Sequence, residues 1–378
     1  AQYGGQTVNR ADEMLEDYAK RDYAKNMDMA RAMIPDSTPI AVAEDMVRGL
    51  KAQEPRWLHF ENREPLPMDE AFDKDLPELD QLREVYAKIM TRKAIYDAMQ
   101  TMEYQINSNR VSNGQTPFVT VGFGLGTSWF AREIQRAILL NRIRGLGKDR
   151  HTAIFPKLVF TIKHGINADE GDPNYDLKQL ALECSTKRMY PDVVFYDNIV
   201  KITGSFKAPM GCRSFLQGWI DPKTGEDVED GRMNLGVVTV NVPRIALESH
   251  GDVDRFWRLF DERMETAHQA LQFRIMRCKQ ATPVNAPTLF RYGAFGRLDA
   301  NDNVDQLFRN ERATVSLGYI GLYEATAVFY GKNWMRDHGW DPQGKEFALE
   351  IVRRMNQLCK HWSAAEGYHY SVYSTPAE

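Results

Sequence analysis

The chain has 378 residues, of which 43% are hydrophobic and 26% charged, and its formal net charge at pH 7 is -4. This composition is typical of a soluble α/β globule made of one large domain or two closely packed ones. It offers no basic excess for a nucleic-acid surface, no apolar run long enough for a membrane helix and no signal peptide. Any nucleotide bound here is expected to be small.

The N-terminal third of the chain is predicted to be mainly helical. Apolar residues recur at helical spacing in three segments, over residues 9–33, 38–48 and 79–109. Pro39 marks the start of the second helix, and Gly49 stands just past its expected end. The proline-rich, acidic segment 54–77 is predicted to be a loop or arm.

Strands and helices alternate in the rest of the chain. The predicted strands, about six in number, are 118–123, 157–162, 192–196, 235–241, 314–319 and 368–374. The predicted helices are 128–144, 176–188, a segment opening at Pro243, 252–279, 321–330 and 344–362. The order of strand, helix, strand, helix, strand in the first part of this region favours parallel strands with helices packed outside.

Cys212 stands between glycines in the segment Gly204–Trp219, GSFKAPMGCRSFLQGW, which has neither helical nor strand period. The segment is predicted to be a loop. Strand-like runs flank it at 193–203 and 234–242, so the loop is expected to be held between buried strands. Its sulfur is either a small apolar filler or a reactive group, and position alone leaves both possibilities open.

The other cysteines, Cys184, Cys278 and Cys359, lie far from Cys212 and from one another, with no CxxC pair. This spacing argues against a zinc site and a secreted disulfide scaffold and favours a reducing cytoplasm. The histidines show no HExxH spacing, and no metal is assigned. Because the chain begins at Ala1 and not at Met, it is expected to be a piece of a longer polypeptide.

Two loop motifs each allow a functional and a structural interpretation. GFGLG at Gly122–Gly126 resembles a dinucleotide fingerprint but lacks the third spaced glycine and the acidic residue after the next strand, so a strand-to-helix turn is favoured. The acidic residues Asp169, Glu170 and Asp172 offer oxygen ligands for magnesium or calcium. A solvated loop that caps the helix at Tyr175 or Asp176 is favoured over a metal site.

The last five residues, Ser374 to Glu378, place two hydroxyls before a proline, which is typical of a helix start. A helix N-terminus with hydroxyls is suited to bind phosphate. A simple N-cap, with Glu378 completing a capping box, explains the same residues equally well.

Segments spread from Tyr3 to Glu378 resemble, in the same order, the catalytic core of class III anaerobic ribonucleoside-triphosphate reductases, the glycyl-radical branch. The matching segments are YGGQTVNRADE, NGQTPF, GDPNYDLKQLALECSTKRMYPDVVFYD, MGCRSFL, GRMNLGVVTVNVPRIALES, RATVSLGYIGLYEA and YSTPAE.

The resemblance implies an α/β fold in which a ten-stranded barrel of two parallel half-barrels surrounds a central finger loop carrying Cys212. It implies a single catalytic domain over 1–378, in which 1–110 is the mainly helical dimer and effector region and 111–378 is the barrel with its finger loop at 204–219. The family's N-terminal ATP-cone and its C-terminal glycyl-radical and zinc segment have no counterpart in this sequence.

The resemblance also assigns roles to residues. Cys212 becomes the thiyl radical, and Asn234 matches the active-site asparagine of the formate-using members. Without the resemblance, Asn234 is equally well explained as a turn residue before Leu235. The substrate-binding candidates are Gln115, Thr116, Ser374 and Thr375.

Gln6 stands at the possible position of the family's second active-site cysteine. If that alignment is right, the formate mechanism that uses the second sulfur is in doubt, and reduction by formate alone or by a redoxin is open.

The implied function is anaerobic reduction of ribonucleoside triphosphates to 2'-deoxyribonucleoside triphosphates, with formate as the expected reductant. The implied cofactor is a glycyl radical on a segment outside this chain, supplied by a longer precursor or in trans by a companion chain and installed by a radical-SAM iron-sulfur activase; zinc belongs to that same segment. The implied partners are dNTP and ATP effectors and a second copy of the chain, with the contact in the helices between Asn9 and Arg48. The alternative function is a catalytically inactive nucleotide-binding or assembly module that retains the barrel.

Overall fold

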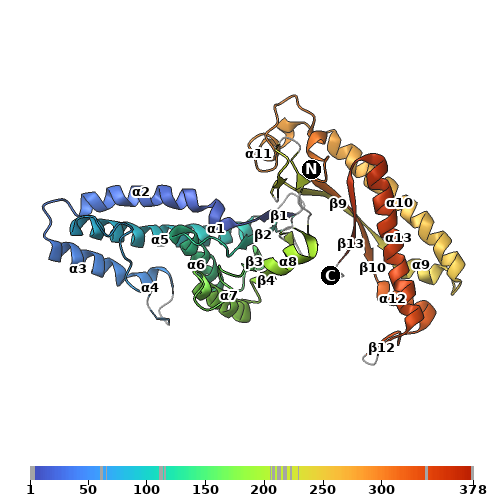
Figure 1. Cartoon of the computed structure of the whole chain (residues 1–378), viewed down its shortest axis with the longest axis horizontal. Helices are drawn as coiled ribbons and strands as arrows, with labels where there is room; N and C mark the ends of the chain where they lie inside the picture. Colours follow the sequence, from blue (N-terminus) through green and yellow to red (C-terminus); the bar gives the residue numbers. More distant parts are fainter. Residues whose placement is uncertain are drawn as a thin grey trace. The chain divides into compact units, whose positions relative to one another are not determined.

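The described elements of the chain fall into two units, each built on a parallel β-sheet (Figure 1). The N-terminal unit runs from β1 (Gly5–Val8) to β5 (Pro209–Met210), and the C-terminal unit runs from β6 (Ser214–Phe215) to β13 (His369–Ser374). The computed structural model describes residues 5–59, 63–64, 66–109, 114, 116–204, 206, 209–210, 214–215, 219–221, 224–228, 230–336 and 339–375. None of the helices in these ranges has the length and apolar character needed to span a membrane.

A four-stranded parallel sheet in the order β1-β2-β3-β4 forms the centre of the N-terminal unit. Its further strands are β2 (Phe118–Phe123), β3 (Lys157–Ile162) and β4 (Asp192–Phe195). The helices are α1 (Ala11–Met14), α2 (Glu16–Met33), α3 (Ile40–Lys51), α4 (Glu54–Trp57), α5 (Glu78–Ser108), α6 (Trp129–Arg144), α7 (Tyr175–Arg188) and α8 (Tyr196–Thr203). Helical crossovers return the chain between parallel neighbours, so the predicted alternation and parallel order are confirmed.

The apolar core of this unit lies between the sheet and helices α5, α6 and α7. Phe123 of β2 and Phe160 of β3 are at most 2% exposed, and their rings meet edge to face. They belong to one buried cluster with Tyr96 of α5, Leu139 of α6 and Ala181 of α7. Burying an aromatic side chain of this size contributes about 1.5–3 kcal/mol, so the cluster fixes the helices on this face of the sheet.

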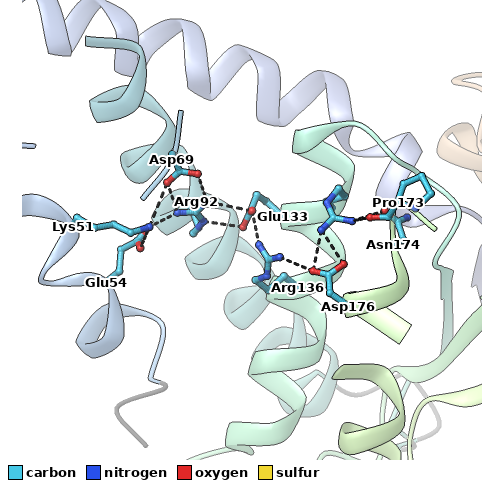
Figure 2. A network of polar contacts seen from close by, with 10 residues as sticks. Lys51, Glu54, Asp69, Arg92, Glu133, Arg136, Pro173, Asn174 and Asp176 are labelled. Carbon is cyan, nitrogen blue, oxygen red and sulfur yellow. Dashed lines mark hydrogen bonds and ion pairs between the residues drawn. The ribbon is translucent and has the colours of Figure 1, made fainter. Parts of the chain in front are cut away.

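A buried network of charges joins α3, α4 and α6 to α5 (Figure 2). The guanidinium of Arg92 donates to Glu54 Oε1 at 2.6 Å and to Asp69 Oδ1 at 2.6 Å. Its Nε donates to Glu133 Oε2 at 2.8 Å. Lys51 Nζ lies 2.5 Å from Glu54 Oε2. One arginine thus holds three carboxylates from three different parts of the unit.

The network extends from α6 to α7 (Figure 2). Arg136 donates to Glu133 Oε1 at 2.6 Å and to Asp176 Oδ2 at 3.2 Å. Arg132 also donates to Asp176, at 2.9 Å, and to Asn174 Oδ1 at 2.8 Å. The loop before α7 is therefore tied to α6 by charge-assisted hydrogen bonds, which are stronger than neutral ones.

A three-stranded parallel sheet in the order β13-β10-β9 forms the centre of the C-terminal unit. Its other two strands are β9 (Met233–Asn241) and β10 (Ala313–Ile320), with β10 in the middle. The helices are α9 (Val242–Glu248), α10 (Val253–Lys279), η1 (Pro283–Asn285), α11 (Pro287–Phe290), η2 (Val304–Leu307), α12 (Leu322–Tyr330) and α13 (Pro342–Glu366). Short strands are β7 (Trp219–Ile220), β8 (Asp227–Val228), β11 (Met335–Arg336) and β12 (Gly339–Trp340).

The two faces of this second sheet differ in chemistry. Helices α10 and α13 pack on one face (Figure 1), where Val315 and Leu317 are at most 1% exposed. Because side chains alternate along a strand, Thr314, Ser316 and Gly318 of β10 lie on the opposite face, where Thr314 and Ser316 are also buried. We call this second surface the polar face of the C-terminal sheet.

Four local predictions are corrected by the structure. Helix α3 continues through Gly49 to Lys51, and Glu54–Trp57 in the predicted loop forms α4; the Lys51–Glu54 ion pair joins the two helices. The predicted helix 9–33 is divided at Leu15 into α1 and α2. The strand-like run 193–203 is a strand only to Phe195, because its remainder forms α8, which ends at the left-handed Gly204.

Candidate active site

The glycine-rich turn between β2 and α6 is filled by a side chain of the protein itself. Gly124 N and Gly126 N donate to Asp12 Oδ2 at 3.1 and 2.9 Å, and Gln135 Nε2 donates to the same oxygen at 2.8 Å. These N–H groups are the ones that a phosphate would need. Gly124 has φ +127°, and a Cβ there would lie 2.8 Å from Thr161 O. The structure therefore confirms the predicted strand-to-helix turn and does not support the dinucleotide site that the glycine pattern resembles.

The acidic loop before α7 is organised by its own hydrogen bonds. Asp172 Oδ2 accepts from Asp169 N at 2.9 Å, and Asp169 Oδ2 lies 2.9 Å from His164 Nδ1. The N-cap residue of α7 is Asn174, whose side chain donates to Gly126 O and caps no helical N–H. The acidic loop still caps the predicted helix start, but through the backbone carbonyl of Asp172, which accepts from Tyr175 N at 3.1 Å, and not through an acidic side chain. Over the described ranges, no group of three or more His, Cys, Asp or Glu side chains is placed to hold a metal ion.

The cysteines in the described part of the chain have the character of apolar filler. Cys184 and Cys359 are buried, and burial raises the pKa of each thiol to about 12. Cys278 is half-buried, and burial raises its pKa as well. Thiols in such surroundings are poor nucleophiles. Cys212, the predicted radical residue, lies outside the described residues.

We expect Cys184 and Cys359 to resist alkylation in the folded chain. With a pKa of about 12, only about one thiol in 10⁵ is ionised near neutral pH, and both sulfurs are buried. Iodoacetamide labelling followed by peptide mass spectrometry should leave both unmodified until urea is added, while the half-buried Cys278 reacts first. Equal labelling of all three before unfolding would contradict the packing described here.

Strand β1 carries the position predicted for the family's second cysteine. Gln6 pairs in register with Val119, a residue that packs on the core side of the sheet. Thr7 pairs with Thr120 on the opposite face, where both hydroxyls are buried and have no hydrogen-bond partner among the described residues. Strand β5, which ends at Met210, contacts β1. The chain therefore brings the segment just before Cys212 beside the strand of Gln6.

The two substrate-binding candidates from the NGQTPF segment lie just before β2. Thr116 is partly buried and precedes the first residue of that strand by two positions. Gln115 lies outside the described residues. Thr116 and Gln6 belong to the N-terminal unit, whereas Asn234, Ser374 and Thr375 belong to the C-terminal unit.

Asn234 lies in β9 and not in a turn. It is placed at a β-bulge, because the register passes from Thr314 opposite Asn234 to Val315 opposite Gly236. Asn234 Nδ2 donates to Ser316 Oγ at 2.8 Å, and Asn234 Oδ1 accepts from Gly236 N at 2.8 Å. These bonds hold the amide against the polar face, beside the hydroxyl of Ser316.

Thr375 lies at the other end of the polar face. Its N–H donates to Tyr319 O at 3.1 Å, which continues the pairing of β13 with β10 by one residue. Its Oγ1 lies 2.9 Å from Thr239 Oγ1 of β9. Ser374 is exposed, and strand alternation directs its side chain to the face opposite that of Thr375. The predicted hydroxyl pair is therefore split, and Thr375 remains on the face of Asn234.

Asn234 and Thr375 share a face but do not touch. Asn234 is opposite Thr314, and Thr375 meets Thr239 above Gly318, four residues further along β10. At the rise of a parallel strand this separation is roughly 13 Å. One small group could therefore not contact both residues.

The sequence reasoning missed three residues of the polar face: Thr239, Ser316 and Gly318. A signal for two of them was present in the strand ATVSLGYI, where small or polar residues alternate with Val, Leu and Tyr. That period of two marks one face of a strand as polar. Thr239 could be placed only once the register of β9 against β10 was known.

The described elements define a parallel α/β protein, with Asn234 and Thr375 on the polar face of its C-terminal sheet. The family model of the anaerobic ribonucleoside-triphosphate reductases matches residues 1–378. The chain is 47% identical over 377 residues to the anaerobic ribonucleoside-triphosphate reductase of Haemophilus influenzae, and 46% identical over 378 residues to that of Escherichia coli. The reductase of Enterobacteria phage T4 is 42% identical over 384 residues.

The alignments cover 100% of this chain and 46% of each bacterial relative, or 54% of the phage relative. The chain thus spans about half the length of these relatives. It also superimposes on a solved anaerobic ribonucleotide reductase with a TM-score of 0.55 at 14% identity, covering 100% of this chain and 49% of the other. The Thermotoga maritima enzyme with glycerol in its active site gives 0.54 at 15%, covering 98% and 50%. The protein belongs to the anaerobic ribonucleoside-triphosphate reductase family.

Proposed function

We propose that this chain forms the core in which a ribonucleoside triphosphate is reduced to its 2'-deoxy form under anaerobic conditions. The observation that carries the proposal is the 46–47% identity to two bacterial reductases across the whole chain. The polar face of the C-terminal sheet supports it, because Asn234 and Thr375 are spaced for an elongated ligand.

Cys212 is proposed to act as a thiyl radical. Cys212 would give up the hydrogen atom of its thiol to a glycyl radical outside these 378 residues, which leaves the unpaired electron on the sulfur. The sulfur then takes the hydrogen atom from C3' of the ribose, which forms an S–H bond and leaves the unpaired electron on the sugar carbon. The two bonds are comparable in strength, so the transfer is nearly reversible and the hydrogen can be returned after reduction.

The reaction needs two electrons and two protons, and formate can supply both electrons together with one of the hydrogens. The 2'-hydroxyl takes up a proton and leaves as water, and formate is the proposed reductant, oxidised to carbon dioxide. Ribonucleotide, formate and one proton thus become deoxyribonucleotide, carbon dioxide and water. A redoxin is the alternative reductant, since Gln6 stands where the second cysteine is expected.

Asn234 has the hydrogen-bonding capacity for this role. A carboxamide carries two N–H donors and two acceptor lone pairs. The bonds to Ser316 and from Gly236 N take one of each. The remaining donor fits a formate oxygen, and the remaining acceptor fits a ribose hydroxyl. An uncharged amide holds both without repelling the carboxylate.

The same proposal includes the features that the family resemblance implies beyond this chemistry. They are a single catalytic domain, a ten-stranded barrel of two parallel half-barrels, dNTP and ATP effectors, a homodimer contact in the helices between Asn9 and Arg48, and a radical-SAM activase. The four- and three-stranded parallel sheets support the half-barrels, because a half-barrel is itself a parallel sheet. The mainly helical segment before β2 supports a separate regulatory region.

The proposal is tested by anaerobic reconstitution. The chain is combined with a glycyl-radical segment from a relative, its activase, formate and a labelled ribonucleoside triphosphate, and the deoxynucleotide is measured. Labelled product that requires this chain supports the proposal. Nucleotide binding without any product would instead favour the inactive binding or assembly module.

We expect Asn234→Ala to lower turnover about a hundredfold, the usual loss when one preorganised donor is removed from an active site. Ser316→Ala is the control, because it removes one partner of Asn234 and leaves the amide in place. Its expected loss is less than about tenfold, the scale of one net hydrogen bond. Initial rates in the reconstituted assay measure both. Equal losses in the two variants would assign Asn234 a structural role.

A further inference from the structure

Gly318 forms a gap in the polar face of the C-terminal sheet. It lies in the central strand β10, opposite Thr239 of β9 and Tyr373 of β13. A Cβ at position 318 would lie 2.5 Å from Thr375 Oγ1 and 2.6 Å from Thr239 Oγ1, closer than Cβ atoms approach other atoms. Because glycine leaves this space empty, the two hydroxyls meet across the central strand at 2.9 Å.

The hydrogen-bonding capacity of this pair is asymmetric. Each threonine hydroxyl has one donor and two acceptor sites, and the bond between them uses one donor and one acceptor. One O–H is therefore directed at the oxygen of the other threonine, and the second O–H stays available to a ligand. Thr239 is exposed and Thr375 is partly buried, so a ligand can approach both.

We propose that Thr239 is a positioning residue that orients the hydroxyl of Thr375 toward a phosphate oxygen of the substrate. Thr239 donates to Thr375 Oγ1, and Thr375 then directs its own O–H toward the ligand. The donated bond polarises the second hydroxyl and makes it a better donor. Gly318 is the residue that allows this contact. The inference rests on the proposed function and on the sequence prediction that Thr375 binds substrate through its phosphates.

The test compares three variants of the full chain by calorimetric titration with CTP and with cytidine, which has no phosphate. Thr239→Val keeps the shape of the side chain and removes the hydroxyl, Thr239→Ser restores the hydroxyl, and Thr375→Val removes the contact to phosphate. We expect Thr239→Val to weaken CTP binding about threefold to tenfold, the value of one net hydrogen bond. Cytidine binding should stay unchanged, and Thr239→Ser should bind CTP like the parent chain.

Two variants of the pair separate failure of this inference from failure of the proposed function. Normal CTP binding by Thr239→Val together with weak binding by Thr375→Val overturns the role of Thr239 and keeps the phosphate contact. Normal CTP binding by both variants would show that Thr375 makes no important contact with phosphate, and the inference would then fail as well. Equal loss of CTP and cytidine binding in Thr239→Val also overturns the inference, because it indicates a general distortion of the sheet.

A second experiment tests the same contact with a substitution in the central strand. Gly318→Ala is expected to separate the two hydroxyls, because its Cβ would displace both oxygens. It should weaken CTP binding at least as much as Thr239→Val, with an unchanged circular dichroism spectrum. CTP binding at the parental level in a folded Gly318→Ala chain would show that the hydroxyl pair is dispensable.

Discussion

Replacement of Cys212 by serine is expected to abolish deoxynucleotide formation in the reconstituted anaerobic system. Sulfur can act as the relay because its S–H bond is similar in strength to the activated C3'–H bond of the ribose. The O–H bond of serine is much stronger, so its oxygen cannot be oxidised by the same radical source. Product formation from a labelled ribonucleoside triphosphate measures the effect, while CTP titration and circular dichroism should remain close to those of the parent chain.

The matched control for this prediction is Cys278→Ser. Cys278 lies at the end of α10 and is only half-buried, so it is the most accessible cysteine in the described part of the chain. Its replacement should leave turnover within about twofold, as expected for a surface substitution away from the site. Full activity of Cys212→Ser would contradict the radical mechanism. Loss of activity in both variants would indicate a general sensitivity to cysteine replacement.

Much of the fold could be predicted from local patterns. Strands β2 and β3 begin and end where their alternating or apolar residues predict, and α6 begins after Ser128, whose hydroxyl accepts from Ala131 N. These elements carry their own start and stop signals within a few residues. Their parallel arrangement follows from the alternation of strands with helices.

Other elements depend on partners far away in the sequence. Strand β1 has four residues and is stabilised by pairing with β2, more than a hundred residues later. Helix α8 contains isoleucine, valine and threonine, which favour strands, and tertiary context overrides that preference. Such cases cannot be decided from a local window of sequence.

The candidate site was predictable in part. The family resemblance predicts Asn234, the hydroxyls before Pro376 predict Thr375, and the structure puts both on one face of the C-terminal sheet. Ser374 was paired with Thr375 by adjacency alone, although adjacent strand residues face opposite ways. The contact of Thr375 with Thr239 depends on the register of three strands and on the missing side chain at Gly318, which no motif encodes.

The carboxylates that bind Arg92 are among the least exposed charged groups of the N-terminal unit. The carboxylates of Glu54, Asp69 and Glu133 have side chains that are 2%, 8% and 4% exposed. Burial by itself raises the pKa of Asp69 and of Glu133, but the adjacent arginines, with Lys51 at Asp69, outweigh it and lower both. Both groups therefore stay charged in the folded chain because cations surround them.

The contribution of Asp69 and Glu133 to the stability of the N-terminal unit is accordingly expected to fall as the pH is lowered. A carboxylate whose folded pKa lies below its ordinary value stabilises the fold above that value, which is 3.8 for Asp69 and 4.5 for Glu133. This contribution is lost as the pH falls through the lower, folded pKa. Urea unfolding of the parent chain between neutral pH and pH values below the ordinary ones should therefore show a decline in the free energy of unfolding.

Arg92→Met is expected to destabilise the N-terminal unit by about 3–5 kcal/mol, because it removes the guanidinium that three buried carboxylates share and leaves only Lys51 and Arg136 beside them. The matched control is Lys93→Met on the same helix, which removes an exposed ion pair with Asp97 and should cost less than about 1 kcal/mol. Urea unfolding and hydrogen exchange in α5 and α6 measure both variants near neutral pH. The Arg92 variant should also lose less of its remaining stability on acidification, because the pKa values of Asp69 and Glu133 are no longer held down by its guanidinium. Similar losses in the two variants would mean that the buried network adds no more to the fold than a surface ion pair.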